Sequence, residues 1–212
     1  MVCLSDNDVI LKLAACNLLD DVWGGLGVSK TDVYVLPTAK HKLGVSKNPK
    51  WAQERFGNET FSRLRDFFLW ARDIDVEIDQ ADLQSLLEVE GIDSGEAVLF
   101  AASASLEASR ILTGDKRSLR ALASDLSCRP VAARLVGRVI CFEQIVKNAI
   151  GNLGFAEVLN RVLPGLDCDT ALRAAFGSGK EATEVNVVDA LDRYIVELRS
   201  LPIDFLSSQG QL

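Results

Sequence analysis

Three acidic residues lie where predicted strands end or predicted helices begin. Asp6 stands between a short apolar run, residues 1–4, and a longer apolar-periodic segment that starts at residue 9. Asp115 follows a short apolar run, and Glu96 opens an alanine-rich segment. Ligands of open α/β sheets bind beyond the carboxyl ends of the strands. We therefore expect Asp6, Glu96 and Asp115 to converge on one acidic site.

Metal binding is the chemistry that such a group of carboxylates supports. Mg²⁺ prefers hard oxygen ligands and is usually held by a few carboxylates together with water and substrate phosphates. The bound ion can activate a water molecule and stabilise charge that develops at phosphorus. Without a cation the carboxylates repel one another, which raises the pKa of at least one of them.

Each of these residues also has a purely structural interpretation. Asp6 and Glu96 lie near predicted helix N-termini, where a capping or acidic side chain contributes about 0.5–2 kcal/mol. Asp115 follows a glycine in a turn, where aspartate is common for conformational reasons. The residue context favours the metal-binding interpretation for all three, while the capping interpretation remains open.

Three further acidic residues are weaker candidates. Asp8 lies in the first turn of the first predicted helix, so its charge is expected to stabilise the helix N-terminus, with metal binding as the alternative. Asp93 is predicted to cap the helix that contains Glu96. Glu143 ends the last predicted strand, and we hypothesise that it reaches the same sheet edge.

Strands and helices alternate up to residue 142, which predicts a parallel α/β sheet. Residues 73–79 alternate between polar and apolar types, which is typical of a short strand or an extended connector. From residue 143 onward only helical patterns occur, so we expect an α/β domain over 1–142, a helical extension packed on it over 143–201 and a flexible tail over 202–212. The remaining strands are expected at 33–36, 110–113 and 136–142, and the main helices at 59–72, 82–89, 95–110 and 183–200.

The chain of 212 residues has a formal net charge of −7, which disfavours binding of nucleic acid by bulk electrostatics. RNA would therefore need a local basic patch or a bridging cation. A basic segment, residues 40–55, offers such a patch, although a solvated loop is the alternative. Trp51 and Phe56 within or beside it suit base stacking or anchoring to the core, and His41 is expected at the surface. The lysines that we expect to contact RNA are Lys40, Lys42, Lys47 and Lys50.

The five cysteines are odd in number and widely spaced, and the chain has one histidine. This usage argues against a structural zinc site and fits a reducing compartment. Cys3, Cys16 and Cys141 lie in apolar runs and are expected in the core. The chain shows neither a signal-peptide pattern nor an apolar run long enough to span a membrane. We expect a cytoplasmic protein without membrane contact.

The order of these motifs resembles that of the PIN domain. The resemblance rests on Asp6 after the first strand, Gly-Glu96-Ala at a helix start, and Leu-Thr-Gly-Asp115 after a buried strand. It implies a three-layer α/β/α fold with acidic residues holding Mg²⁺ or Mn²⁺, and ribonuclease activity of the kind found in toxin–antitoxin pairs. The chain departs from the family pattern at residues 38–42, where a glutamate is usual, and at residues 116–118, where another acid often follows.

The leading hypothesis is therefore a metal-dependent endoribonuclease, with Asp6, Glu96 and Asp115 as catalytic metal ligands. The alternative is a PIN-fold binding or scaffold protein without catalysis, which the net charge and the missing glutamate favour. A third hypothesis is a metal-dependent phosphatase, suggested by the Asp6-x-Asp8 pair after a strand. The protein partners considered are an antitoxin-like protein and a second copy of the chain.

Overall fold

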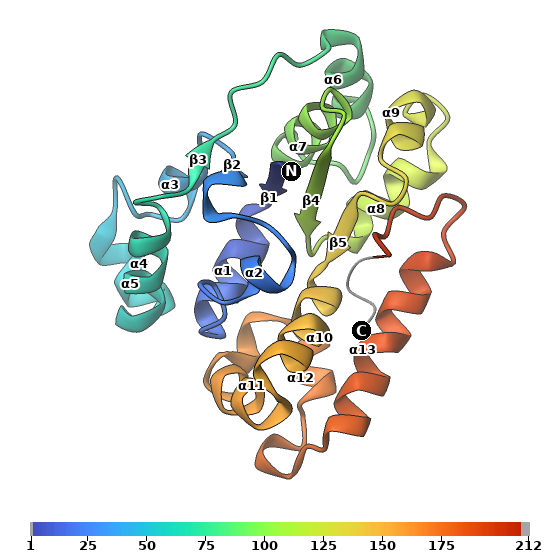
Figure 1. Ribbon diagram of the computed structural model, residues 1–212. Helices are drawn as coiled ribbons and strands as arrows, with labels where there is room; N and C mark the ends of the chain where they lie inside the picture. The colour runs from blue at the N-terminus through green and yellow to red at the C-terminus, as the bar shows by residue number, and fades with distance from the viewer. Residues whose placement is uncertain (1, 209–212) are drawn as a thin grey trace.

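The computed structural model describes residues 2–208 and contains a five-stranded, all-parallel sheet at its centre (Figure 1). The strand order is β3-β2-β1-β4-β5. This arrangement confirms the predicted α/β class with a parallel sheet. The strands span β1 Val2–Ser5, β2 Val33–Val35, β3 Arg72–Asp73, β4 Ser109–Thr113 and β5 Val139–Cys141.

Strand β1 lies in the middle of the sheet because its residues can be buried on both faces. It pairs in parallel with β2 through Leu4 and Tyr34, and with β4 through Leu4 and Ile111. Cys3, Leu4 and Ser5 are all fully buried. Continuous burial is typical of parallel strands that are covered by helices on both sides. The chain segments that leave β1 and β4 therefore start from the interior of the molecule and meet at one edge.

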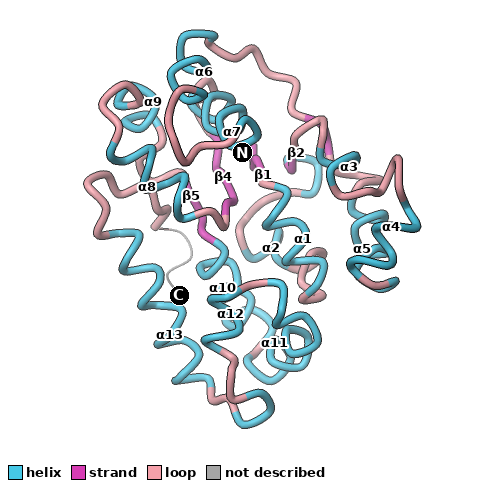
Figure 2. The backbone as a smooth tube through the Cα atoms, turned by 180° about the vertical axis from the view of Figure 1, so that it is seen from behind, coloured by secondary structure: helices cyan, strands magenta, loops and turns pink. Residues whose placement is uncertain are grey.

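Helices cover both faces of the sheet and form a three-layer α/β/α arrangement, which Figure 2 shows from behind. Neighbouring residues of a strand point to opposite faces, and in β4 Leu112 and Ile111 belong to two different hydrophobic clusters. The helices are α1 Asn7–Ala15, α2 Val22–Gly25, α3 Ala39–Lys42, α4 Pro49–Phe56, α5 Asn58–Phe67, α6 Gln80–Leu87, α7 Ser94–Ala104, α8 Lys116–Ser124, α9 Arg129–Arg134, α10 Phe142–Leu153, α11 Phe155–Val162, α12 Thr170–Ala175 and α13 Glu184–Arg199, with 3₁₀ turns η1 Lys30–Asp32, η2 Leu163–Cys168 and η3 Gly179–Glu181.

Most predicted elements are present, with differences at their ends. Helix α7 ends at Ala104 rather than at residue 110. Serine hydroxyls at and beyond this end form hydrogen bonds with a backbone carbonyl and with each other, and the helix does not continue. The Ser105 hydroxyl donates to the Ala101 carbonyl oxygen at 3.0 Å, and the Ser103 and Ser109 hydroxyls lie 2.7 Å apart. Residues 73–79 form the end of β3 followed by an extended connector, as one of the two alternatives predicted.

The C-terminal helices share a hydrophobic core with the α/β part of the chain. Phe142 and Ile145 from α10 and Leu191 from α13 belong to the same buried cluster as Leu112 of β4 and Leu4 of β1. Helix α10 begins directly after β5, so the sheet and the helical extension are joined without a linker. The extension is therefore packed on the sheet and not connected to it through a flexible segment.

The segment after α13 differs from the predicted flexible tail. Its residues up to Ser208 run beside β5, and Leu206 forms a parallel bridge with Val139. The Val139 amide donates to the Phe205 carbonyl oxygen at 2.8 Å, and Phe205 and Leu206 are buried. The prediction was wrong for residues 202–208 because the segment is too short to show a strand pattern, whereas the free edge of β5 can pair with it. The expected tail residues 209–212 lie outside the described residues.

We predict that Phe205→Ala destabilises the protein by about 3–5 kcal/mol, because the ring is 1% exposed and its removal leaves a cavity. Urea unfolding measures the change. Leu69→Ala is the matched control, since Leu69 is 81% exposed and its truncation should alter stability by about 0.5 kcal/mol or less. Equal stability of the two variants would contradict the packing of this segment.

No helix within residues 2–208 combines the length and the apolar character that a membrane span requires.

Candidate functional site

The three predicted site residues, Asp6, Glu96 and Asp115, line one cavity of about 270 Å³ at the carboxyl edge of the sheet. They come from the ends of β1 and β4 and from the first turn of α7. The parallel order of β1 and β4 places Asp6 and Asp115 at the same edge, as the sequence predicted. The other lining residues are Asn7, Asp8, Leu36, Lys42, Asp93 and Gly95.

Asp6 occupies the N-cap position of α1, but within the described residues its side chain makes no capping hydrogen bond. The standard capping geometry is therefore not formed, although the nearby amides of Asn7 and Asp8 favour the charged form of Asp6. Burial, together with the nearby negative charge of Asp8, raises the pKa of Asp6 to about 6. A carboxylate that is ionised here at neutral pH is partly desolvated and can gain from a cation in the cavity.

Glu96 takes part in a capping box at the start of α7. Asp93 accepts hydrogen bonds from the amides of Gly95 and Glu96 at 2.7 and 2.9 Å, which confirms Asp93 as the cap. One oxygen of Glu96 accepts from the Asp93 amide at 2.8 Å. The capping interpretation of Glu96 thus accounts for one of its two carboxyl oxygens. Gly95 lines the cavity next to Leu36, and a Cβ added at Gly95 would lie only 3.1 Å from Leu36 Cδ1.

Asp115 caps α8 and faces the cavity as well. Its Oδ1 accepts from the amides of Arg117 and Ser118 at 2.7 and 3.2 Å, and its Oδ2 lies 3.2 Å from an Arg117 guanidinium nitrogen. Burial opposes the charge of Asp115. The hydrogen bonds from Ser118, Glu96 and Arg117 outweigh it and lower the pKa of Asp115 below its ordinary value.

Glu96 and Asp115 influence each other's pKa across the cavity. Burial is the largest cause that raises the pKa of Glu96, and the nearby Asp115 raises it further, to about 7. The charged form of Glu96 is therefore disfavoured while Asp115 stays ionised, because two adjacent carboxylates without a cation repel each other. A metal ion that bound between them would have to displace the proton of Glu96.

Asn7 adds a polar atom that sequence analysis did not identify. Its Oδ1 is buried, and it has no hydrogen-bond partner within residues 2–208. A buried carbonyl oxygen without a partner costs about 1–3 kcal/mol, so its presence in the wall of a cavity needs an explanation. A hard cation or a donor group of a ligand would satisfy it. The signal that could have found Asn7 is its position directly after Asp6.

Asp8 and Glu143 are engaged with lysines. Asp8 also lines the cavity, but its Oδ2 lies 2.5 Å from Lys12 Nζ, which in turn lies 2.7 Å from Asp169. Glu143 is buried and its Oε1 lies 2.6 Å from Lys116 Nζ. Glu143 lies just after β5 at the carboxyl edge of the sheet, as hypothesised, but it is not among the described residues that line the cavity. It is bound instead by Lys116, the residue directly after Asp115.

The basic segment lies beside the cavity on α3 and α4. Lys42 lines the acidic cavity, close to the position where the PIN resemblance leads one to expect a glutamate. Lys47, Lys50 and His41 are exposed. Trp51 is 41% exposed and packs edge-on against Phe56 with ring centroids 5.6 Å apart. The two rings thus pack against each other within α4, and part of the indole stays accessible.

The oxygen ligands that line the cavity are of the type that a hard divalent cation prefers, but they do not surround a single point. Asp6, Glu96, Asp115 and Asn7 supply carboxylate and carbonyl oxygens, which Mg²⁺ and Mn²⁺ prefer. Within residues 2–208, however, no three acidic, histidine or cysteine side chains are gathered at metal-binding distances.

Comparison of this chain with family models, with curated proteins and with solved structures gives no match. The PIN resemblance therefore remains a prediction from motifs. The acidic cavity is the structural feature from which a function can be inferred.

Proposed function

We propose that this chain is a divalent-metal-dependent endoribonuclease whose metal is bound by Asp6, Glu96 and Asp115. The observation that carries the proposal is that Asp6, Glu96 and Asp115 line one cavity at the carboxyl edge of the sheet. Two raised carboxyl pKa values in one cavity are the electrostatic signature of a site built for positive charge.

Each residue has a role in this proposal that follows from its position. Asp6 lines the cavity without forming a standard cap on α1, so its carboxylate is assigned as a ligand. Glu96 is fixed by its hydrogen bond to the Asp93 amide, and it gives up its proton when a cation enters. Asp115 is held by the amides of α8, so its charge stays at the edge of the sheet.

Phosphodiester chemistry suits this arrangement. A bound Mg²⁺ or Mn²⁺ supplies an activated water molecule and charge stabilisation at phosphorus. Lys42 lines the same cavity, and Lys40, Lys47 and Lys50 lie on the adjoining segment, where they can contact the phosphates on either side of the cleaved bond. These contacts compensate locally for the net charge of −7.

The test is cleavage of a fluorescent single-stranded RNA by the purified chain with Mn²⁺ and with EDTA. We expect internal cuts with Mn²⁺ and none with EDTA. Glu96→Gln should reduce the cleavage rate at least about 100-fold, because it removes the charge that would hold the metal. The variant should still fold, because glutamine can complete the capping box with the Asp93 amide. Cleavage that is equally fast in this variant would contradict the proposal, as would an intact RNA. Nitrophenyl phosphate in a parallel reaction tests the phosphatase alternative.

A binding protein without catalysis is the second candidate function. The observation in its favour is that cations of the chain itself already neutralise Asp8, Glu143 and Asp115, through Lys12, Lys116 and Arg117. Such a protein would bind RNA through the basic segment without cutting it. Salt-dependent RNA binding by both the wild type and Glu96→Gln, with no cleavage by either, would favour this function.

A further inference from the structure

Two cysteines that are far apart in the sequence lie side by side in the fold. The sulfur atoms of Cys16 and Cys168 are 3.8 Å apart, across 152 residues of chain. Cys16 follows α1 and is fully buried, whereas Cys168 ends η2 and is partly exposed. Cys16 was predicted to lie in the core, and its burial confirms this prediction. The wide spacing of the cysteines in the sequence did not indicate that Cys16 and Cys168 lie together.

Close contacts hold the two thiols in place. The backbone of η2 lies directly against the end of α1, since a Cβ added at Gly165 would lie 2.6 Å from the Ala15 carbonyl oxygen. On the other side of the pair, Lys12 of α1 binds Asp169 at 2.7 Å. Both contacts join the same two segments that carry Cys16 and Cys168. The approach of the sulfurs is therefore a property of this junction.

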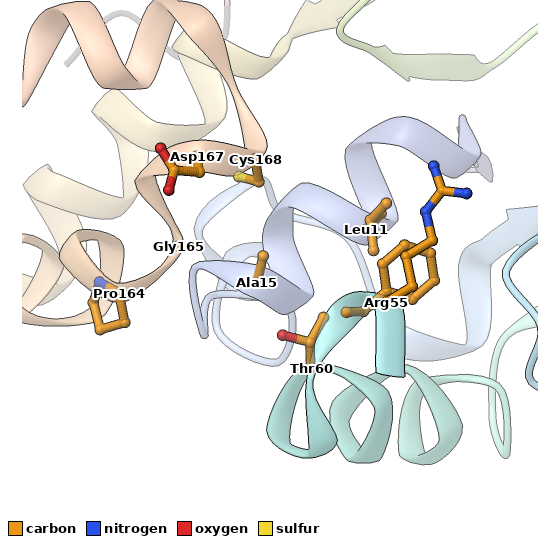
Figure 3. A pocket seen from close by; sticks show the side chains of 9 residues that line it. Leu11, Ala15, Arg55, Thr60, Pro164, Gly165, Asp167 and Cys168 are labelled. Atoms are coloured by element: carbon orange, nitrogen blue, oxygen red, sulfur yellow. The ribbon is translucent and has the colours of Figure 1, made fainter. Parts of the chain in front are cut away.

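The thiol of Cys168 is accessible from a second cavity, separate from the acidic one. This cavity of about 430 Å³ is lined by Cys168 together with residues of α1, α4, α5 and η2. Figure 3 shows Cys168 on the η2 side, with Ala15 and Leu11 of α1 on the facing wall. A small polar reagent can thus reach Cys168, while Cys16 lies behind it.

The two thiols differ in acidity. The hydrogen bond from Cys16 is the largest cause that lowers the pKa of Cys168. Burial opposes this effect, and the nearby Lys12 supports it. The pKa of Cys16 is raised by the same hydrogen bond and by burial. Because the thiolate is the reactive form, Cys168 is the nucleophile of the pair. Cys3, Cys128 and Cys141 are buried and each has a raised pKa, chiefly because burial disfavours the thiolate.

We propose that Cys16 and Cys168 form a reversible disulfide when the protein reacts with a hydroperoxide. The Cys168 thiolate attacks one peroxide oxygen, and the O–O bond breaks. With hydrogen peroxide this leaves a sulfenic acid on Cys168 and releases hydroxide, which takes up a proton to become water. The Cys16 sulfur then attacks the Cys168 sulfur, its proton leaves with the departing hydroxyl as a second water, and the S–S bond forms. Each turn oxidises two thiols and reduces one peroxide.

Bond formation requires a small movement and changes how two parts of the chain are connected. The sulfurs must approach from 3.8 Å to about 2.05 Å. The new bond would link α1 of the α/β part to η2 of the helical extension. Cross-linking so long a loop restricts the unfolded chain strongly, so the melting temperature should rise by about 5–15 °C.

The experiment treats the full chain with hydrogen peroxide under native conditions. We expect two of the five thiols to be lost, one peptide pair linked through Cys16 and Cys168 in non-reducing mass spectrometry, and a higher melting temperature that dithiothreitol reverses. Cys128→Ala is the matched control and should behave as the wild type. Cys16→Ala should stop at a sulfenic acid on Cys168, which dimedone traps.

A second variant tests the geometry without touching either thiol. Gly165→Ala should displace η2 from α1, because the added methyl group would collide with the Ala15 backbone. Both thiols are still present in this variant, but the disulfide should form at least about tenfold more slowly. The proposal would be overturned if the wild type kept all its thiols, if the disulfide involved any other cysteine, or if disulfides formed only between different molecules. These results do not depend on RNA cleavage or on metal binding.

Discussion

Asp6→Asn is expected to make the metal-free protein more stable by about 1–2 kcal/mol at pH 7.5 and to lower its rate of RNA cleavage at least about 100-fold. The gain in stability arises because burial and Asp8 disfavour the charged form of Asp6, whose pKa is about 6. Asparagine has nearly the same shape without the charge. The loss of activity arises because asparagine removes one of the three carboxylates that are proposed to hold the metal. Urea unfolding without metal and an RNA cleavage assay measure the two effects.

Opposite signs of these two effects distinguish a functional carboxylate from a structural one. A residue kept for stability would lose stability when replaced, whereas strain at a functional site is relieved by replacement. Asp189→Asn is the control, because it removes the same charge from an exposed position on α13. If Asp6→Asn were destabilising and still active, Asp6 would be a structural residue and the proposed site would be wrong.

The stability of the metal-free protein is expected to fall by about 2–4 kcal/mol as the pH rises from 4.5 to 7. The folded-state pKa values of Glu96 and Asp6, about 7 and about 6, lie above their ordinary values of 4.5 and 3.8. In this window the unfolded chain has released protons that the folded chain still holds. Unfolding therefore becomes easier as the pH rises, and the loss is complete above the folded-state pKa of Glu96. Partial solvent exposure of Asp6 reduces the effect from the full value of the shifts.

Urea unfolding at a series of pH values measures this dependence. The Asp6→Asn, Glu96→Gln double variant is the control and should be nearly insensitive to pH over the same range, because neither replacement titrates. With saturating Mn²⁺ the wild type should instead gain stability as the pH rises, since metal binding requires the carboxylates to be ionised. A metal-free wild type whose stability rises from pH 4.5 to 7 would contradict the raised pKa values of Glu96 and Asp6.

The sequence predicted the sheet and the meeting of the three acids because both follow from local patterns. Apolar runs that are buried on both faces define β1 and β4, and the parallel order then brings Asp6 and Asp115 to one edge. Glu96 joins them because its helix starts at the same edge. Acidic residues at strand ends and helix starts of one sheet edge were thus correctly predicted to meet.

Contacts between distant segments could not be predicted in the same way. Which side chain faces the cavity depends on rotamers and on competing ion pairs. The sequence therefore did not place Lys42 and Asn7 in the cavity wall, and it did not show that Glu143 binds Lys116 instead of joining the three acids. The pairing of residues 204–207 with β5 needs the free sheet edge, which no pattern within that short segment reveals. The approach of Cys16 to Cys168 likewise depends on how η2 packs against α1.

The most direct test of the central claim is a thermal unfolding titration with Mn²⁺ on the wild type, Asp115→Asn and the control Asp189→Asn. Asparagine at position 115 can still cap α8, so the variant is expected to fold. A ligand of the folded state stabilises it by about 2.7 kcal/mol at 100 times its dissociation constant. We predict a concentration-dependent rise in melting temperature for the wild type and for Asp189→Asn, and none for Asp115→Asn. An equal rise in all three proteins, or no rise in the wild type, would contradict a metal site in the acidic cavity.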